Sequence, residues 1–322
     1  MEYPGAASPS YLVTSASNAN VEVVQIIRNG RVTKVVATGR ALEDASWSAD
    51  GSFLAWLADG NRLVAARGDG GAQRVLARLG DCRVLCSFSY DWSPLGHRLV
   101  VAGVGGDKRR VVSIDAATGT VRDVTPPGAG TWYRSPRWSP TGRLIAYTQE
   151  GGVLGTASCC KLALVVAAPD GRGLRTLVRF DEPIHDSPFV SWAPDGRRLA
   201  FTTDGRSTRD PRFAIVDVTT GKLHRLSPRV ANLTYQVVWA PNGHRIAYGT
   251  SGMPERVATV GVDGLDLLVL QGEGIPAGWA RDGNLTVIRG RQIVEMRDQP
   301  QAIGRVVFRL LRDGYVLSVD RR

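Results

Sequence analysis

Six segments of the chain repeat one pattern, in which a tryptophan ends a short apolar run and a tight polar turn follows. The fourth and fifth copies read VSWAPDGRRLAF from Val190 and VVWAPNGHRIAY from Val237. Successive tryptophans are 45, 46, 54, 47 and 40 residues apart, a period that indicates a repeat architecture. The six copies are anchored at Trp47, Trp92, Trp138, Trp192, Trp239 and Trp279.

Each copy predicts four short strands, A to D, joined by turns. In the fourth copy, Pro194 presets φ and Gly196 accepts a positive φ, so strand A turns tightly into strand B. The runs FAIVDVTTG and LHRLS then supply strand C, a turn and strand D. A single antiparallel sheet cannot bury both of its faces, whereas sheets packed radially can. The chain is therefore predicted to be all-β, a propeller of four-stranded antiparallel blades.

The two ends of the chain predict one blade that both of them build. The N-terminal segment, 10–40, matches strands B, C and D but has no tryptophan-bearing strand A. The run VVFRLL (306–311) completes the sixth copy, and YVLSVD (315–320) is left to supply the missing strand. This split blade, 10–40 plus 314–320, gives seven blades in a single domain over 1–322, and 322 divided by seven is 46. A six-bladed ring is the alternative, because the sixth copy is short and degenerate.

The W-[SA]-P-[DN]-G-x-x-[LI]-A-[FY] units resemble the TolB-type, or WD-repeat-like, bacterial β-propeller repeat. The resemblance covers nearly the whole chain, and it is specific in the fourth and fifth copies and looser in the first, second and sixth. The same repeat occurs in stand-alone periplasmic proteins, in surface lipoproteins and in the gating propellers of prolyl-oligopeptidase-like enzymes. The resemblance therefore implies the fold far more strongly than the function. For a propeller without an attached enzyme domain, it implies protein–protein interaction in the cell envelope.

The sequence shows no recognisable catalytic motif. A serine peptidase of this kind needs a Gly-x-Ser-x-Gly elbow, and the nearest string, Gly249 to Gly252, lacks that pattern. We therefore expect a non-catalytic protein with no cofactor and no metal site. Two alternatives remain: a propeller lyase or glycoside hydrolase with its active site in the central channel, and the regulatory propeller of a longer protein.

Charged and aromatic residues just before the tryptophans are predicted to line the rim of the central channel, where a partner would dock. His185 lies in the loop DEPIHDSP that leads into the fourth copy, and we expect it on the same face. The predicted binding residues are Asp44, Asp91, Arg134, His185 and Tyr235.

The four cysteines lie in two loops, which the predicted propeller places on one face of neighbouring blades. Cys82 and Cys86 precede the strand A of the second copy, and Cys159 and Cys160 lie in the B–C loop of the third. We expect a disulfide between the two pairs, which would indicate an oxidising, extracytoplasmic compartment. Free buried thiols and a four-thiolate zinc site are the alternatives, and the adjacent cysteines are poor geometry for zinc.

The net charge of +10 comes almost entirely from arginine, which supplies 36 of the 40 basic residues. This excess indicates either an acidic partner or simply the arginine usage of a GC-rich genome. We expect a monomer that binds a protein or peptide and not nucleic acid, because the basic residues do not cluster in sequence. No apolar run is long enough to span a membrane, and the first residues show no signal peptide, although a leader or anchor outside this chain is compatible with the extracytoplasmic prediction.

Overall fold

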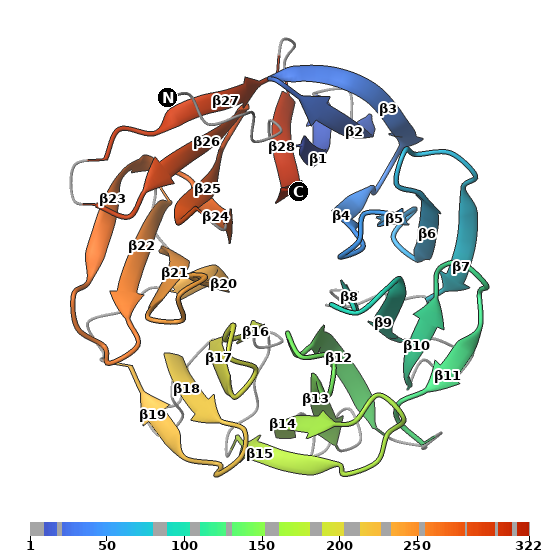
Figure 1. Cartoon of the computed structure of the whole chain (residues 1–322), viewed down its shortest axis with the longest axis vertical. Coiled ribbons are helices and arrows are strands. Elements are labelled where there is room, and N and C mark those ends of the chain that lie inside the picture. Colours follow the sequence, from blue (N-terminus) through green and yellow to red (C-terminus); the bar gives the residue numbers. More distant parts are fainter. Residues whose placement is uncertain are drawn as a thin grey trace, which may run out of the picture.

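The computed structural model of the chain describes residues 10–17, 21–79, 89–103, 110–126, 131–151, 161–180, 189–202, 213–226, 233–250, 255–280, 282–299, 302–310 and 314–321. In these residues the strands form seven four-stranded antiparallel sheets, and there is no helix that is long and apolar enough to cross a membrane. The sheets form a ring, with one strand of each nearest the common axis (Figure 1). The prediction of a seven-bladed propeller is confirmed, and the six-bladed alternative is excluded.

Blade 1 joins the two ends of the chain, as predicted from the sequence. Its sheet has the order β28-β1-β2-β3, so the C-terminal strand is the innermost one (Figure 1). Residues 11–17 pair with residues 321–314 in an antiparallel register, with one irregularity after Thr14. The strands are β28 (Gly314–Arg321), β1 (Ser10–Ser17), β2 (Glu22–Arg28) and β3 (Arg31–Gly39).

Blades 2 to 4 follow in chain order, each as a four-strand meander that runs outward from the axis. Blade 2 has β4 (Glu43–Trp47), β5 (Phe53–Ala58), β6 (Arg62–Arg67) and β7 (Arg74–Arg78). Blade 3 has β8 (Tyr90–Trp92), β9 (Arg98–Ala102), β10 (Val111–Asp115) and β11 (Val121–Asp123). Blade 4 has β12 (Trp132–Trp138), β13 (Ile145–Gly151), β14 (Lys161–Ala167) and β15 (Arg175–Arg179).

Blades 5 to 7 repeat the same order. Blade 5 has β16 (Val190–Trp192), β17 (Arg198–Thr202), β18 (Phe213–Asp217) and β19 (Leu223–Arg225). Blade 6 has β20 (Leu233–Trp239), β21 (Arg245–Thr250), β22 (Arg256–Gly261) and β23 (Leu268–Glu273). Blade 7 has β24 (Ile275–Trp279), β25 (Asn284–Arg289), β26 (Gln292–Arg297) and β27 (Arg305–Arg309).

The turn after each tryptophan has the conformation that its residues predict. In blade 5, Gly196 has a φ of 67°, which a residue with a Cβ adopts only with strain. Its amide donates to the Ala193 carbonyl at 2.9 Å and closes the turn. The Asp195 carboxylate accepts from the Arg197 amide at 2.8 Å, the local bond that favours Asp in turns.

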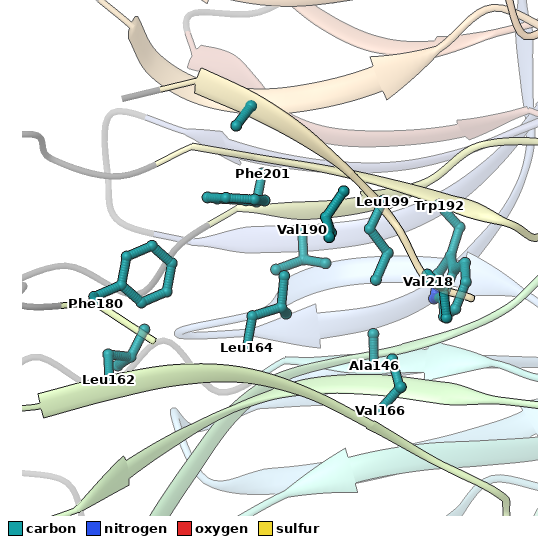
Figure 2. Packing of buried hydrophobic residues seen from close by; sticks show 12 residues of the cluster. Ala146, Leu162, Leu164, Val166, Phe180, Val190, Trp192, Leu199, Phe201 and Val218 are labelled. Atoms are coloured by element: carbon teal, nitrogen blue, oxygen red, sulfur yellow. The ribbon is translucent and has the colours of Figure 1, made fainter. Parts of the chain in front are cut away.

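The core consists of apolar clusters that lie between neighbouring blades. Figure 2 shows the cluster between blades 4 and 5, where Leu164 and Phe180 of one sheet face Leu199 and Phe201 of the next. All four side chains are almost completely buried, and Trp192 is 8% exposed at the end of the cluster nearest the axis. The tryptophans are therefore packing residues between sheets, as their recurrence predicts.

The tryptophan indoles also connect the blades by hydrogen bonds. In four blades the indole N–H donates to the carbonyl of the residue that precedes the tryptophan of the previous blade. The donor–acceptor pairs are Trp92–Ser46 at 3.2 Å, Trp192–Arg137 at 3.1 Å, Trp239–Ser191 at 3.0 Å and Trp279–Val238 at 3.3 Å. In these four blades the bond fixes how the inner strand sits against that of the previous blade.

The junction between blades 7 and 1 contains a buried polar contact. The Tyr11 hydroxyl of β1 donates to Glu295 Oε1 of β26 at 2.6 Å, and Arg305 pairs with Glu295 Oε2 at 3.2 Å. Tyr11 is 2% exposed and Glu295 is 6% exposed. The apolar residues around this contact, including Phe308 and Val316, complete the closure of the ring.

Candidate functional site

Two aspartates on inner strands bond to the backbone of the next blade. Asp320 Oδ2 of β28 accepts from the Trp47 amide of β4 at 2.7 Å. Asp91 Oδ2 of β8 accepts from the Trp138 amide of β12 at 2.7 Å. The innermost strand is an edge of its sheet. Amides on its free side therefore need hydrogen-bond acceptors from outside the sheet, such as these aspartates.

A bulge in each of two inner strands changes the direction in which the residues before the tryptophan point. The pairing of β4 shifts between Glu43 and Ser46, and that of β12 shifts between Arg134 and Arg137. Asp44 and Ser135 both have a φ of 51°, and each stands three residues before its tryptophan. Bulges and left-handed non-glycine residues often occur at functional sites. The two inner strands therefore share a distorted backbone where predicted site residues lie.

Tyr90 joins blades 2 and 3 beside these aspartates. Its hydroxyl donates to the Ala55 carbonyl at 2.7 Å, contacts the Asp44 carbonyl, and lies 3.0 Å from the Ser46 hydroxyl. Burial raises the pKa of Tyr90 well above its ordinary value, and the nearby charges of Asp44 and Asp320 raise it further. The carboxylates of blades 1 and 2 thus lie close to a single phenol.

Burial also shifts the carboxylates of this region. It raises the pKa of Asp91 to about 6, and Arg137 together with hydrogen bonds from the Trp138 and Trp92 amides opposes the rise. Burial raises the pKa of Asp44 against the opposing charge of Arg137. Burial and the neighbouring charge of Asp44 raise the pKa of Glu43. We call Glu43, Asp44, Asp91 and Asp320 the inner-strand acidic cluster.

No protein-family model matches the chain, and no curated protein matches it in sequence. Solved structures match its fold. The chain is 18% identical to TolB from Acinetobacter baumannii, with 81% of this chain and 63% of that one covered and a TM-score of 0.54. It is 15% identical to a putative TolB from Agrobacterium tumefaciens, with 99% of each chain covered and a TM-score of 0.54. These likenesses show that the chain shares the β-propeller fold of these proteins. It is also 11% identical to an oligogalacturonate lyase from Vibrio parahaemolyticus, with 95% and 90% covered and a TM-score of 0.59.

The propeller places three of the predicted site residues on neighbouring inner strands. The positive charge of Arg137 acts on the carboxylates of both Asp44 of β4 and Asp91 of β8. Arg134 of β12 forms an ion pair with Glu150 of β13, with 3.0 Å between Nη2 and Oε2. Arg134 thus lies on the blade next to that of Asp91, and its charge is paired within blade 4.

The roles of the remaining residues stay predictions. Tyr235 belongs to β20, but its side chain lies outside what the structure describes. His185 and all four cysteines, Cys82, Cys86, Cys159 and Cys160, lie outside the described residues, so the disulfide remains a prediction. Within the described ranges, no three His, Cys, Asp or Glu side chains are grouped so that they could hold a metal ion.

Sequence reasoning missed three members of this region: Tyr90, Arg137 and Asp320. Tyr90 and Arg137 stand within two residues of a tryptophan, where side chains are expected to pack between blades and not to join a polar network. For Asp320 the sequence does give a weak indication, because the segment that contains it is predicted to be an inner strand. Its aspartate would then be expected to lie beside the start of blade 2.

Proposed function

We propose that this TolB-like propeller is a non-catalytic binding scaffold of the cell envelope, which receives a basic segment of a partner protein or peptide at the inner-strand acidic cluster. The observation that supports this most is that Asp44, Asp91 and Asp320 lie on three consecutive inner strands. Asp44 and Asp320 act electrostatically on Tyr90, and Arg137 acts on both Asp44 and Asp91. Asp91 and Asp320 are half-buried, and removing their charges from water costs free energy. A bound cationic group would offset that cost.

The proposal refines the partner expected from the sequence. The overall charge indicates either an acidic partner or only the arginine usage of the genome, and both interpretations still apply to the exposed surface of the molecule. At the inner-strand acidic cluster the local charge has the opposite sign, so a lysine, arginine or amino terminus is the complementary group. The extracytoplasmic location rests on the TolB resemblance and on the cysteine pairs, and it stays a prediction.

A fluorescein-labelled tetralysine peptide tests the site. We expect the Asp44→Asn/Asp91→Asn double variant to bind it at least about 10-fold more weakly than the unmodified protein at pH 7.5, as measured by fluorescence anisotropy, which corresponds to about 1.4 kcal/mol. The loss follows from removing two negative charges while the amide side chains keep the shape of the site.

The matched control is the Asp170→Asn/Asp263→Asn double variant, which removes the same charge from exposed turns of blades 4 and 6. It should bind the peptide as the unmodified protein does. Equal losses in the two double variants would show general charge attraction and contradict the site. Turnover of an acidic polysaccharide by the unmodified protein, lost in Asp44→Asn/Asp91→Asn, would instead favour the enzyme alternative.

A further inference from the structure

Two blades carry an arginine and a hydroxyl at matching positions on the face that looks toward the next blade. In blade 3 these are Arg98, which precedes the partner of Trp92 in β9, and Ser113 of β10. In blade 6 they are Arg245 and Thr259, which hold the same register positions in β21 and β22. The internal repeat therefore offers two copies of one local arrangement in different surroundings.

In blade 6 this arrangement holds a carboxylate. Asp298, which follows β26 of blade 7, forms an ion pair with the guanidinium of Arg245. The Thr259 hydroxyl donates to Asp298 Oδ1 at 2.6 Å, and Arg245 Nη2 donates to that hydroxyl at 2.7 Å. The Asp298 side chain is only 11% exposed. An arginine and a hydroxyl in this register thus bind a carboxylate that the neighbouring blade provides.

At the matching position, the blade next to blade 3 carries no such group. Blade 4 carries Ala168-Pro169 where blade 7 carries Arg297-Asp298. Ser113 faces blade 4, because Val111, two residues earlier in the same strand, packs against Ile145 and Tyr147 of that blade. What lies beside Ser113 is a cavity of about 240 Å³, lined by Arg98, Ser113, Asp115, Thr118, Thr120 and Arg122.

The lining of the cavity favours an anion. Neither Arg98 nor Arg122 forms an ion pair with any carboxylate in the described part of the chain. The one carboxylate of the lining, Asp115, accepts from the amides of Ala117 and Thr118 at 2.9 and 2.8 Å and so serves its own turn. Two guanidinium groups against one carboxylate leave the cavity with a net positive charge, and it opens to solvent because both arginines are exposed.

We propose that this cavity binds the carboxylate of a small ligand, with Arg98 and Ser113 acting toward it as Arg245 and Thr259 act toward Asp298. Arg122 pairs with Ser113 in register and adds a second guanidinium from β11. The Thr118 and Thr120 hydroxyls, 2.8 Å apart, provide further polar contacts. The volume is below the range of about 300–1,000 Å³ of drug-sized sites, which fits a ligand of few atoms. The site is separate from the inner-strand acidic cluster and does not depend on its function.

Titration of the full chain with succinate, followed by the backbone amide signals of Ser113 and Thr120, tests the proposal. We expect saturable shifts with a Kd of about 1 mM, in the range that a few polar contacts can give. Arg122→Gln and Ser113→Ala should each weaken binding at least about fivefold, whereas the exposed Arg31→Gln on blade 1 should leave it unchanged.

Two comparison ligands distinguish a carboxylate from a phosphate and a small ligand from an acidic protein. Tighter binding of inorganic phosphate than of succinate would overturn the carboxylate assignment. Binding of a hexaglutamate peptide at least about tenfold tighter than succinate would overturn the small ligand in favour of an acidic protein. No saturable shift at Ser113 or Thr120, or equal weakening by Arg31→Gln, would overturn the site itself.

Blade 6 supplies an independent arm of the test. The Asp298→Ala variant leaves Arg245 and Thr259 without their carboxylate, which reproduces the situation of blade 3. We expect acetate to raise the Tm of this variant by several degrees more than it raises the Tm of the unmodified protein. An equal effect of acetate on both proteins would show that this arginine–hydroxyl register has no affinity for a free carboxylate and would overturn the inference.

Discussion

Deletion of residues 314–322 is expected to abolish cooperative folding of the propeller. The deletion removes β28, which pairs with β1 over seven residue pairs and provides the innermost strand of blade 1. Each backbone hydrogen bond contributes about 1 kcal/mol net, and burial of Val316 adds about 2 kcal/mol. The sum approaches the whole stability of a typical domain, about 5–15 kcal/mol.

Thermal unfolding followed by circular dichroism measures this effect. The truncated chain should show no sharp transition, and a synthetic peptide of residues 314–322 should restore one by re-forming the strand. Tyr315→Ala is the matched control, because Tyr315 lies in the same strand but is 49% exposed, and its cost should stay within about 0.5 kcal/mol. A truncated chain that melts within a few degrees of the full chain would contradict closure by β28.

The second large effect is expected from Asp91→Asn, which should make the protein more stable than the unmodified chain at pH 8. Burial raises the pKa of Asp91 to about 6, from an ordinary value of 3.8. The folded state therefore holds this proton more tightly than the unfolded state does. Between about pH 4 and pH 6 the contribution of Asp91 to stability falls as pH rises, and above pH 6 the full cost of the buried charge is present.

The size of the effect follows from the shift. About two pKa units correspond to about 3 kcal/mol, which is an upper bound because Asp91 is partly exposed to solvent. Asparagine keeps an oxygen that can accept from the Trp138 amide, so the main change is loss of the charge. Denaturant unfolding at pH 4, 6 and 8 should show the variant gaining on the unmodified protein as pH rises. A difference that does not change with pH, or that matches the one for the exposed Asp263→Asn, would rule out this assignment.

Much of the ring could be predicted from the sequence, because one tryptophan-anchored unit recurs and each unit satisfies its own turn. The closing strand was also predictable, since YVLSVD had no other place in the count of strands. The contact between Asp320 and Trp47 was not, because its two residues are 273 positions apart and their pairing depends on how the first and last segments meet. Nothing in either local sequence indicates the other.

The polar network around Tyr90 was hidden for a different reason. A tyrosine or arginine beside a core tryptophan normally packs along the blade, and the bulges that carry Asp44 and Ser135 into a left-handed conformation have no clear sequence signal. The cavity in blade 3 exists because the next blade carries no carboxylate at the matching position. Ser113 has a counterpart in Thr259, but only the structure shows that Asp298 occupies the site beside Thr259 while the site beside Ser113 is a cavity.

The binding of the tetralysine peptide to the unmodified protein as a function of pH tests the proposed function most directly. Because the pKa of Asp91 is about 6, the inner-strand acidic cluster carries more negative charge at pH 7.5 than at pH 5. We predict that the Kd falls about tenfold between pH 5 and pH 7.5 and that Asp91→Asn removes most of this change. Binding that is independent of pH, or tighter at pH 5, would contradict recognition of a basic segment at this cluster.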